Sequence, residues 1–155
     1  MDRGKLEVLM RLAMLEAAKA AEEGNYPFGA VMTDSDGLVL ASAHNTQVVD
    51  RDPTAHAEIN LIRRLAKEYD EVQFNLFTLV SNAEACSMCF SAAIKTGIRR
   101  FIFGAPSEPH MDPYLTVAEA AKHSQSQLVI TYGVLQEECV KQIKEIRERQ
   151  GRLGQ

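Results

Sequence analysis

Apolar side chains recur every three or four positions near the start of the chain. Leucine, methionine and alanine residues keep this spacing from Leu6 to Ala20, and charged residues fill much of the space between them. Such a period places the apolar residues on one face of a helix. Gly24 and Asn25 follow, a usual signal for a helix end. The first segment is therefore predicted to be one amphipathic helix.

Shorter apolar runs and further helical patterns alternate along the rest of the chain. Two strands are predicted within residues 27–45, because the turn sequence DSDG at 34–37 separates two apolar runs. A polar loop follows them. Beyond it, one helix is predicted to begin at 52, and further helices are predicted over 86–97, 115–123 and 135–150. Strands are predicted over 74–81, 99–105 and 127–133, and a proline-containing loop over 105–114.

This order of elements predicts an α/β fold. Helices between successive strands favour a three-layer α/β/α sandwich around a five-stranded mixed sheet. The first two strands should be antiparallel because a tight turn joins them, whereas the later strands should be parallel because each crosses over through a helix. The length favours one domain spanning residues 1–155.

Composition narrows the class of protein. The net charge of −4 and the pI near 5.6 do not favour a large nucleic-acid footprint. No apolar run is long enough to span a bilayer, and the N-terminal segment has no signal-peptide core. Three cysteines, two of them in one C-x-x-C pair, favour a reducing, cytoplasmic location over a disulfide scaffold.

Two short motifs carry the chemistry of the chain. His56 begins the sequence HAE, and Cys86 and Cys89 enclose the sequence CSMC. One histidine and two thiolates give three zinc ligands, the number that a catalytic zinc uses when a fourth position stays open for water. Glu58 follows at a predicted helix start, from which its carboxylate could reach that water. Either motif alone would be weak, since C-x-x-C pairs are also redox couples or packed cysteines.

Both motifs are predicted to lie at helix starts. The sequence Asp52-Pro53-Thr54 contains a capping side chain followed by proline, which typically opens a helix. His56 and Glu58 would then lie near the positive end of the helix dipole. The start of the helix at 86 would likewise favour thiolates over thiols.

The motif pair resembles the cytidine-deaminase-like zinc deaminase superfamily. HAE is followed thirty residues later by CSMC, and the superfamily carries H-x-E and C-x-x-C in this order. Segments 27–31, 52–58 and 100–105 are similar to those of guanine deaminases and bacterial tRNA adenosine deaminases, and ITYGVLQEEC is similar to the tRNA enzymes. The resemblance implies a cytidine deaminase-like fold, a Zn²⁺ cofactor held by His56, Cys86 and Cys89, and Glu58 as the catalytic residue that moves protons.

The resemblance also implies a set of substrate-binding residues. Asn45 would hold the base rather than serve only as a turn residue, and Phe28 would stack on the substrate rather than belong to the core. Ala57 and Glu84 would place backbone groups around the substrate amine. Asp112, in the proline-containing loop, could cap the pocket. One departure is Ala85, where the family usually has proline, and we expect it in the first turn of the helix that carries Cys86.

Two enzyme functions and one non-catalytic function are compatible with these residues. The first is deamination of a free nucleobase or similar aminated heterocycle, with guanine as the leading candidate, which Phe28 and the acidic balance favour. The second is deamination of adenosine in tRNA, which GVLQEEC and the basic residues of the last helix favour. A zinc-binding module without activity is the third, and the presence of Glu58 argues against it.

The resemblance predicts self-association, most simply as a homodimer with a small-molecule substrate in each pocket and no membrane partner. Residues of the proline-containing loop could then complete the pocket of a neighbouring subunit. Sedimentation at micromolar concentration should give the mass of two chains. A single species with the mass of one chain would contradict the prediction.

Overall fold

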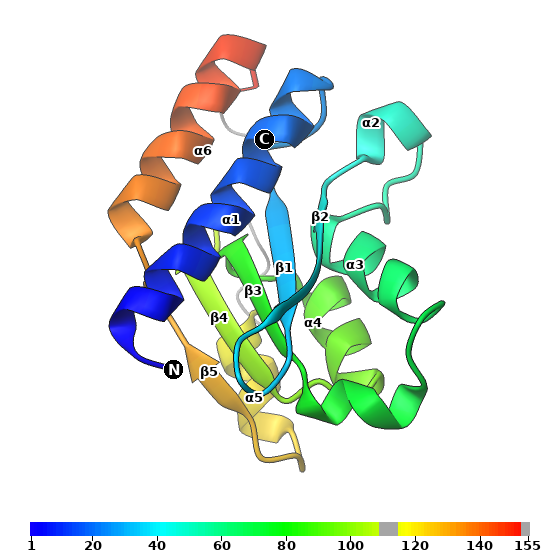
Figure 1. The fold of residues 1–155 in the computed structure, drawn as a ribbon. Coiled ribbons are helices and arrows are strands. Elements are labelled where there is room, and N and C mark those ends of the chain that lie inside the picture. The colour runs from blue at the N-terminus through cyan, green and yellow to red at the C-terminus, as the bar shows by residue number, and fades with distance from the viewer. Residues whose placement is uncertain (109–114, 153–155) are drawn as a thin grey trace.

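A mixed sheet lies at the centre of the computed structural model, which describes residues 1–108 and 115–152 (Figure 1). The strands of this described part run in the order β2-β1-β3-β4-β5. β1 pairs antiparallel with both β2 and β3, whereas β3, β4 and β5 are mutually parallel. The predicted five-stranded mixed sheet is therefore confirmed. Its strands are β1 (Gly29–Thr33), β2 (Val39–His44), β3 (Thr78–Ala83), β4 (Arg100–Ala105) and β5 (Val129–Thr131).

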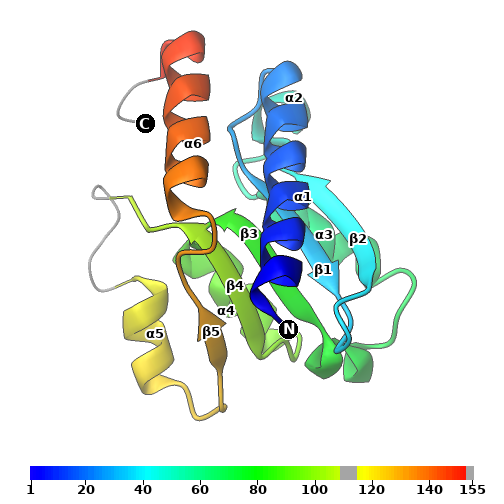
Figure 2. The ribbon, with the colours of Figure 1, turned by 60° about the vertical axis from the view of Figure 1, so that its left-hand side comes forward.

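Helices cover both faces of the sheet and give the predicted three layers (Figures 1 and 2). The amphipathic helix α1 (Arg3–Glu22) lies beside α6 (Gln136–Gln150) on one face. On the other face lie α3 (Ala57–Leu65) and α4 (Ser87–Lys95), with α5 (Val117–His123) next to α4. Sequence periodicity predicted each of these helices, because each has an apolar face to bury.

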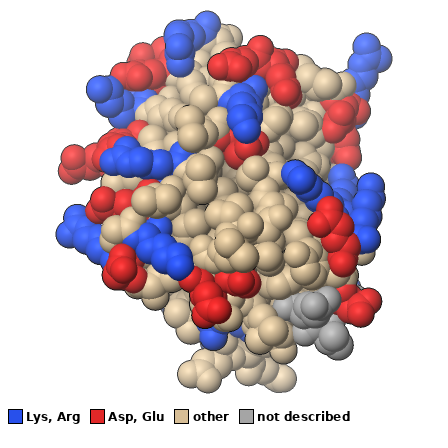
Figure 3. All heavy atoms as spheres, viewed as in Figure 1, with Lys and Arg blue, Asp and Glu red and all other residues tan. Residues whose placement is uncertain are grey.

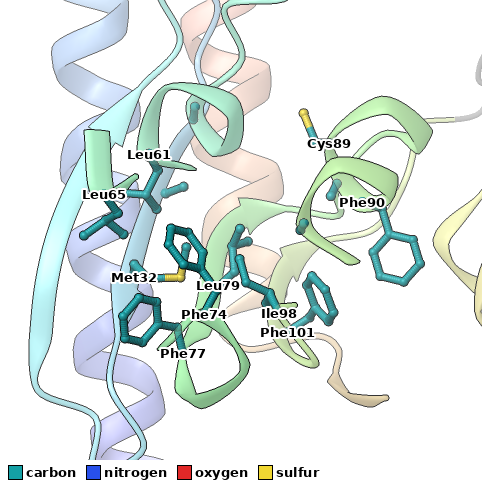
Figure 4. Close-up of a cluster of buried hydrophobic side chains, with 14 of the residues drawn as sticks. Met32, Leu61, Leu65, Phe74, Phe77, Leu79, Cys89, Phe90, Ile98 and Phe101 are labelled. Carbon is teal, nitrogen blue, oxygen red and sulfur yellow. The ribbon is translucent and has the colours of Figure 1, made fainter. Parts of the chain in front are cut away.

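Buried apolar side chains fill the space on both sides of the sheet. Under α3 and α4, Leu61 packs with several phenylalanines, and the rings of Phe90 and Phe101 lie 4.9 Å apart (Figure 4). Under α1 and α6, a second cluster contains Met10, Val31 and Ile143. Burial on both faces explains why the apolar residues of β1 do not alternate with polar ones, whereas β3 combines apolar residues with the buried polar residues Ser81 and Asn82.

Three segments differ most from the sequence prediction. The segment at 74 is not a strand: a 3₁₀ helix (Glu71–Leu76) inserts the ring of Phe74 into the core, and β3 begins at Thr78. Part of the predicted polar loop forms a short helix, α2 (Gln47–Asp50). Helix α3 begins at Ala57 rather than at 52, because Asp52 closes a turn by accepting hydrogen bonds from the backbone N–H and the hydroxyl of Thr54.

Charges of both signs cover the outer side of α1 and α6. Figure 3 shows acidic and basic side chains intermingled on this face. Arg11 of α1 and Glu138 of α6 form an ion pair 2.7 Å long that joins the two helices. Among the described residues, no helix combines the length and the apolar character that crossing a bilayer requires.

Helix α1 lies directly against the first residue of β1. A methyl group on Gly29 would stand 2.2 Å from the carbonyl oxygen of Ala13 and 2.5 Å from the backbone nitrogen of Ala17. Only a residue without a side chain permits this approach, so Gly29 fixes how closely α1 packs on the sheet.

Gly29→Ala should lower the free energy of unfolding by about 1–3 kcal/mol or more, because α1 must move away from the sheet. Gly4→Ala is the matched control, since a methyl group there would meet only an aspartate oxygen at 3.4 Å. It should be neutral or stabilising by up to about 1 kcal/mol, because alanine favours helix over glycine. Denaturant titration measures both, and equal effects would contradict the close packing of α1.

Candidate active site

Helices α3 and α4 begin beside one another at the end of the sheet where β3 and β4 terminate. His56 is the N-cap residue of α3 and Cys86 is the N-cap residue of α4. Both have extended backbone conformations, and neither side chain forms a capping hydrogen bond. The carboxyl ends of parallel strands are the usual position of ligand sites in α/β sheets. Because the side chains of His56 and Cys86 do not cap their helices, they are free to bind a ligand there.

Three metal-binding side chains meet at these helix starts. The ligand atoms of His56, Cys86 and Cys89 all lie within 4.8 Å of one another. Cys86 Sγ lies 3.5 Å from His56 Nδ1. Cys89 lies at the edge of the aromatic core with its sulfur directed away from the rings (Figure 4). One imidazole and two thiolates suit zinc, and three protein ligands leave a fourth tetrahedral position open.

The two thiols differ in acidity. A hydrogen bond from Cys89, aided by His56, lowers the pKa of Cys86 to about 4 against the opposing effect of burial. The same hydrogen bond, together with burial, raises the pKa of Cys89. The Cys86 sulfur also raises the pKa of His56 by accepting its hydrogen bond. Cys86 is therefore the more acidic of the two thiols and becomes a thiolate, an anionic ligand, at the lower pH.

Glu58 lies in the first turn of α3 and is only 6% exposed. Burial raises the pKa of its carboxyl group above the ordinary value. The hydroxyl of Ser81 in β3 donates a hydrogen bond to Glu58 Oε1 over 3.2 Å. A buried carboxyl group with a raised pKa and a fixed orientation is suited to accept and return a proton.

A cavity of about 210 Å³ joins the metal-binding group to Glu58. Three of the residues expected to bind substrate, Phe28, Asn45 and Glu84, line it. Ala57 is fully buried at the start of α3 and is not among the lining residues, while Asp112 lies outside the described residues. The lining consists of Phe28, Asn45, Gln47, His56, Glu58, Ala83, Glu84, Cys86, Pro106, Ser107, Glu108 and Arg147.

Asn45 is both a turn residue and a cavity residue. Its Oδ1 accepts a hydrogen bond from the backbone N–H of Gln47 over 3.0 Å, and its Nδ2 donates to the Gln47 side chain over 2.7 Å. The amide is 1% exposed, so its orientation is fixed by these contacts. Nδ2 carries two N–H donors, and the hydrogen bond to Gln47 uses one of them, so a substrate in the cavity can bond to the other.

Two asparagine side chains, the buried Asn82 and the half-buried Asn60, hold the loops that form the cavity. Asn82 of β3 accepts from the backbone N–H of Gly29 over 2.9 Å and donates to the carbonyl of Pro27 over 3.1 Å, which fixes Phe28 between them. Asn60 of α3 donates to the carbonyl of His44 over 3.0 Å and so holds the segment that carries Asn45. Side-chain amides that bond to the backbone of two segments in this way favour one arrangement of the loops.

Arg147 and Glu108 line the cavity although the sequence analysis did not identify them. Arg147 Nη1 lies 2.7 Å from Glu108 Oε1, and the guanidinium carbon lies 5.6 Å from the centre of the Phe28 ring. One sequence signal for Arg147 exists, because it follows Ile143 by four positions and therefore shares the buried face of α6. No comparable signal exists for Glu108, which lies in a loop.

The expected position of Ala85 in a first helical turn is wrong. Helix α4 begins at Ser87 and Cys86 is its N-cap, so Ala85 precedes the cap and lies outside the helix. The extended backbone of Cys86 delays the helix, since Cys86 directs its sulfur to His56 instead of joining the first turn. The argument that proline would suit residue 85 as a first-turn residue therefore does not apply.

Comparison with known proteins places this geometry in a family. Residues 3–105 match the family described as cytidine and deoxycytidylate deaminase zinc-binding region. A tRNA-specific adenosine deaminase of Haemophilus influenzae is 35% identical over 140 residues, covering 86% of this chain and 78% of the relative.

Solved structures agree with this assignment. One from a study of tRNA:A34 deaminases superposes with a TM-score of 0.73 at 29% identity, covering 86% of this chain and 97% of the other. A guanine deaminase from Nitrosomonas europaea superposes with a TM-score of 0.77, covering 92% and 84%, and at 23% identity it shows the shared fold alone. The chain therefore belongs to the cytidine and deoxycytidylate deaminase family, and it is a zinc-dependent hydrolytic deaminase.

Proposed function

We propose that this chain deaminates a free nucleobase or a similar aminated heterocycle, with guanine as the leading candidate. The observation that carries the proposal is the small, acid-lined cavity. Its volume of about 210 Å³ is below the roughly 300–1,000 Å³ of pockets for drug-sized ligands, which suits one ring system. Glu84 and Glu108 line it together with Glu58, and the one arginine among the described lining residues, Arg147, is paired with Glu108. Such a lining favours a neutral ring over a phosphate-bearing chain.

The reaction replaces an exocyclic amino group by oxygen. Water adds its oxygen to the ring carbon that bears the amino group, the carbon–nitrogen bond breaks, and the products are a ring carbonyl and ammonia. A zinc ion held by His56, Cys86 and Cys89 would lower the pKa of a bound water toward neutrality. Glu58 then takes one proton from the attacking water and delivers it to the ring nitrogen. It next takes the proton of the hydroxyl group formed on the ring carbon and delivers it to the departing amine, as the carbonyl forms and the carbon–nitrogen bond breaks.

Neighbouring side chains prepare Glu58 for this role. The Ser81 hydroxyl holds Oε1, which leaves the other carboxylate oxygen to exchange protons. Burial raises the pKa of Glu58 above its ordinary value, which favours the protonated form that must donate to the leaving amine. Phe28 and Asn45 are proposed to contact the substrate ring, since both line the cavity.

A second candidate is deamination of adenosine in tRNA. The observation in its favour is the 35% identity to a tRNA-specific adenosine deaminase over most of both chains. Against it stand the net charge of −4 and the intermingled charges on the face seen in Figure 3. A protein that binds a folded RNA usually gathers basic side chains on one surface to neutralise phosphates.

The cysteines Cys86, Cys89 and Cys139 are free thiols, which supports the further proposal of a cytoplasmic location.

Cys86→Ala should remove zinc from the purified protein, because two remaining ligands cannot complete the site. Cys139→Ala is the matched control, since Cys139 is a buried cysteine of the second core cluster and lies apart from the metal-binding group. Elemental analysis should give one zinc per chain for the wild type and the control and well below one for Cys86→Ala. Full zinc content in Cys86→Ala would exclude the proposed ligand set.

Glu58→Gln should keep the zinc and lower the deamination rate by at least about 100- to 10,000-fold, because the amide cannot accept and return a proton. The measurement is ammonia release from a panel of aminated purines, pyrimidines, pterins and triazines, together with inosine formation in tRNA. Activity on free rings supports the first candidate, and activity confined to tRNA supports the second. A zinc-loaded wild type that is inactive on the whole panel would overturn both.

A further inference from the structure

Arg147 is the one cationic side chain among the described residues that line the cavity, and it comes from the last helix. Its side chain is 11% exposed. Two contacts hold the guanidinium: the ion pair with Glu108, 2.7 Å long, and the ring of Phe28, 5.6 Å away. Glu108 and Phe28 belong to different parts of the chain, so the planar group is fixed from two sides before any substrate arrives.

The guanidinium has hydrogen-bond donors to spare. It carries five N–H donors, and within the described residues one hydrogen bond is formed, from Nη1 to Glu108. Its Nε is buried and has no hydrogen-bond partner there. Leaving a charged donor unpaired is costly, and simple packing on Phe28 does not require a guanidinium. The N–H donors that Glu108 does not occupy can bind an acceptor brought in by the substrate while Glu108 and Phe28 hold the group in place.

The charge of the surroundings decides which acceptor fits. Glu108 already neutralises Arg147, and Glu84 and Glu58 add two more acidic side chains to the lining. A phosphate or carboxylate on the substrate would meet these acids. A neutral carbonyl oxygen meets no such repulsion and accepts hydrogen bonds from a guanidinium. The acids can in turn accept from the N–H groups of a neutral ring.

We propose that Arg147 is a specificity-determining residue that selects neutral aminated heterocycles bearing a ring carbonyl, which its guanidinium binds while Glu108 and Phe28 hold it in place. The inference rests on the proposed deamination of a small ring and names the substrate class of that site. It assigns Arg147 to recognition of the ring and leaves proton transfer to Glu58.

Pairs of substrates that differ at one group test this assignment. Guanine has a carbonyl and a neighbouring ring N–H where 2,6-diaminopurine has an amino group and an unprotonated ring nitrogen, and isocytosine and 2,4-diaminopyrimidine differ in the same way. Arg147→Gln should lower kcat/KM for the carbonyl member of each pair by about 10- to 100-fold and leave the diamino member nearly unchanged, because only the former loses a charge-assisted hydrogen bond. Arg147→Lys, a milder change, should show the same selectivity, since lysine lacks the planar fork. Arg149→Gln on the exposed side of the same helix is the control and should change neither member.

The possible outcomes separate a failure of the inference from a failure of the proposed function. Equal losses for both members of a pair, in folded and zinc-loaded variants, would show that Arg147 only supports the fold and would overturn the inference alone. Pterin and pterin-6-carboxylate form a third pair, and a loss confined to the carboxylate would overturn it too, because the guanidinium would then bind an anion. A wild type inactive on all of these rings would overturn the proposed function together with the inference.

Discussion

The structure depends on bringing two helix N-termini together at one end of the sheet. N-cap positions usually hold side chains that bond back to the first turn of the helix. Here His56 and Cys86 occupy these positions without capping, and their side chains meet at 3.5 Å. The first-turn N–H groups and both helix dipoles then favour negative charge at the place where thiolates and the carboxylate of Glu58 are needed. Local helix stability is lost at both caps, and the gain is a metal-binding group that the sheet holds rigidly.

The rigidity comes from packing on both sides of that group. Cys89 packs at the edge of the phenylalanine cluster under α3 and α4, and this packing positions its sulfur (Figure 4). Ser81 and Asn82 are neighbours in β3 and therefore point to opposite faces of the sheet. Ser81 holds Glu58, and Asn82 holds the backbone on both sides of Phe28. One central strand thus positions the Glu58 carboxyl group, which we propose transfers protons, and the Phe28 wall of the cavity.

The cavity wall contributed by α6 separates the chemistry from the choice of substrate. The metal-binding residues and Glu58 come from α3, α4 and their caps, whereas Arg147 comes from α6 on the other face of the sheet. Changes in α6 can therefore alter which ring is bound without moving the reactive groups. This arrangement agrees with a family whose relatives include a tRNA-specific adenosine deaminase and whose fold also occurs in a guanine deaminase.

The sequence by itself determined the elements and the reactive groups. Periodicity predicts α1 and α6, the turn at 34–37 predicts the antiparallel pair, and HAE with CSMC predicts the ligand set, because each depends on spacing within a short segment. Only the structure decided the start of α3, where Asp52 closes a turn instead of capping the helix. It likewise decided the start of β3, because Phe74 reaches the core from a 3₁₀ helix although its neighbours have the apolar pattern of a strand. It also decided the contact of Arg147 with Phe28 and Glu108, because residues so far apart in sequence are joined only by the packing of α6 on the sheet.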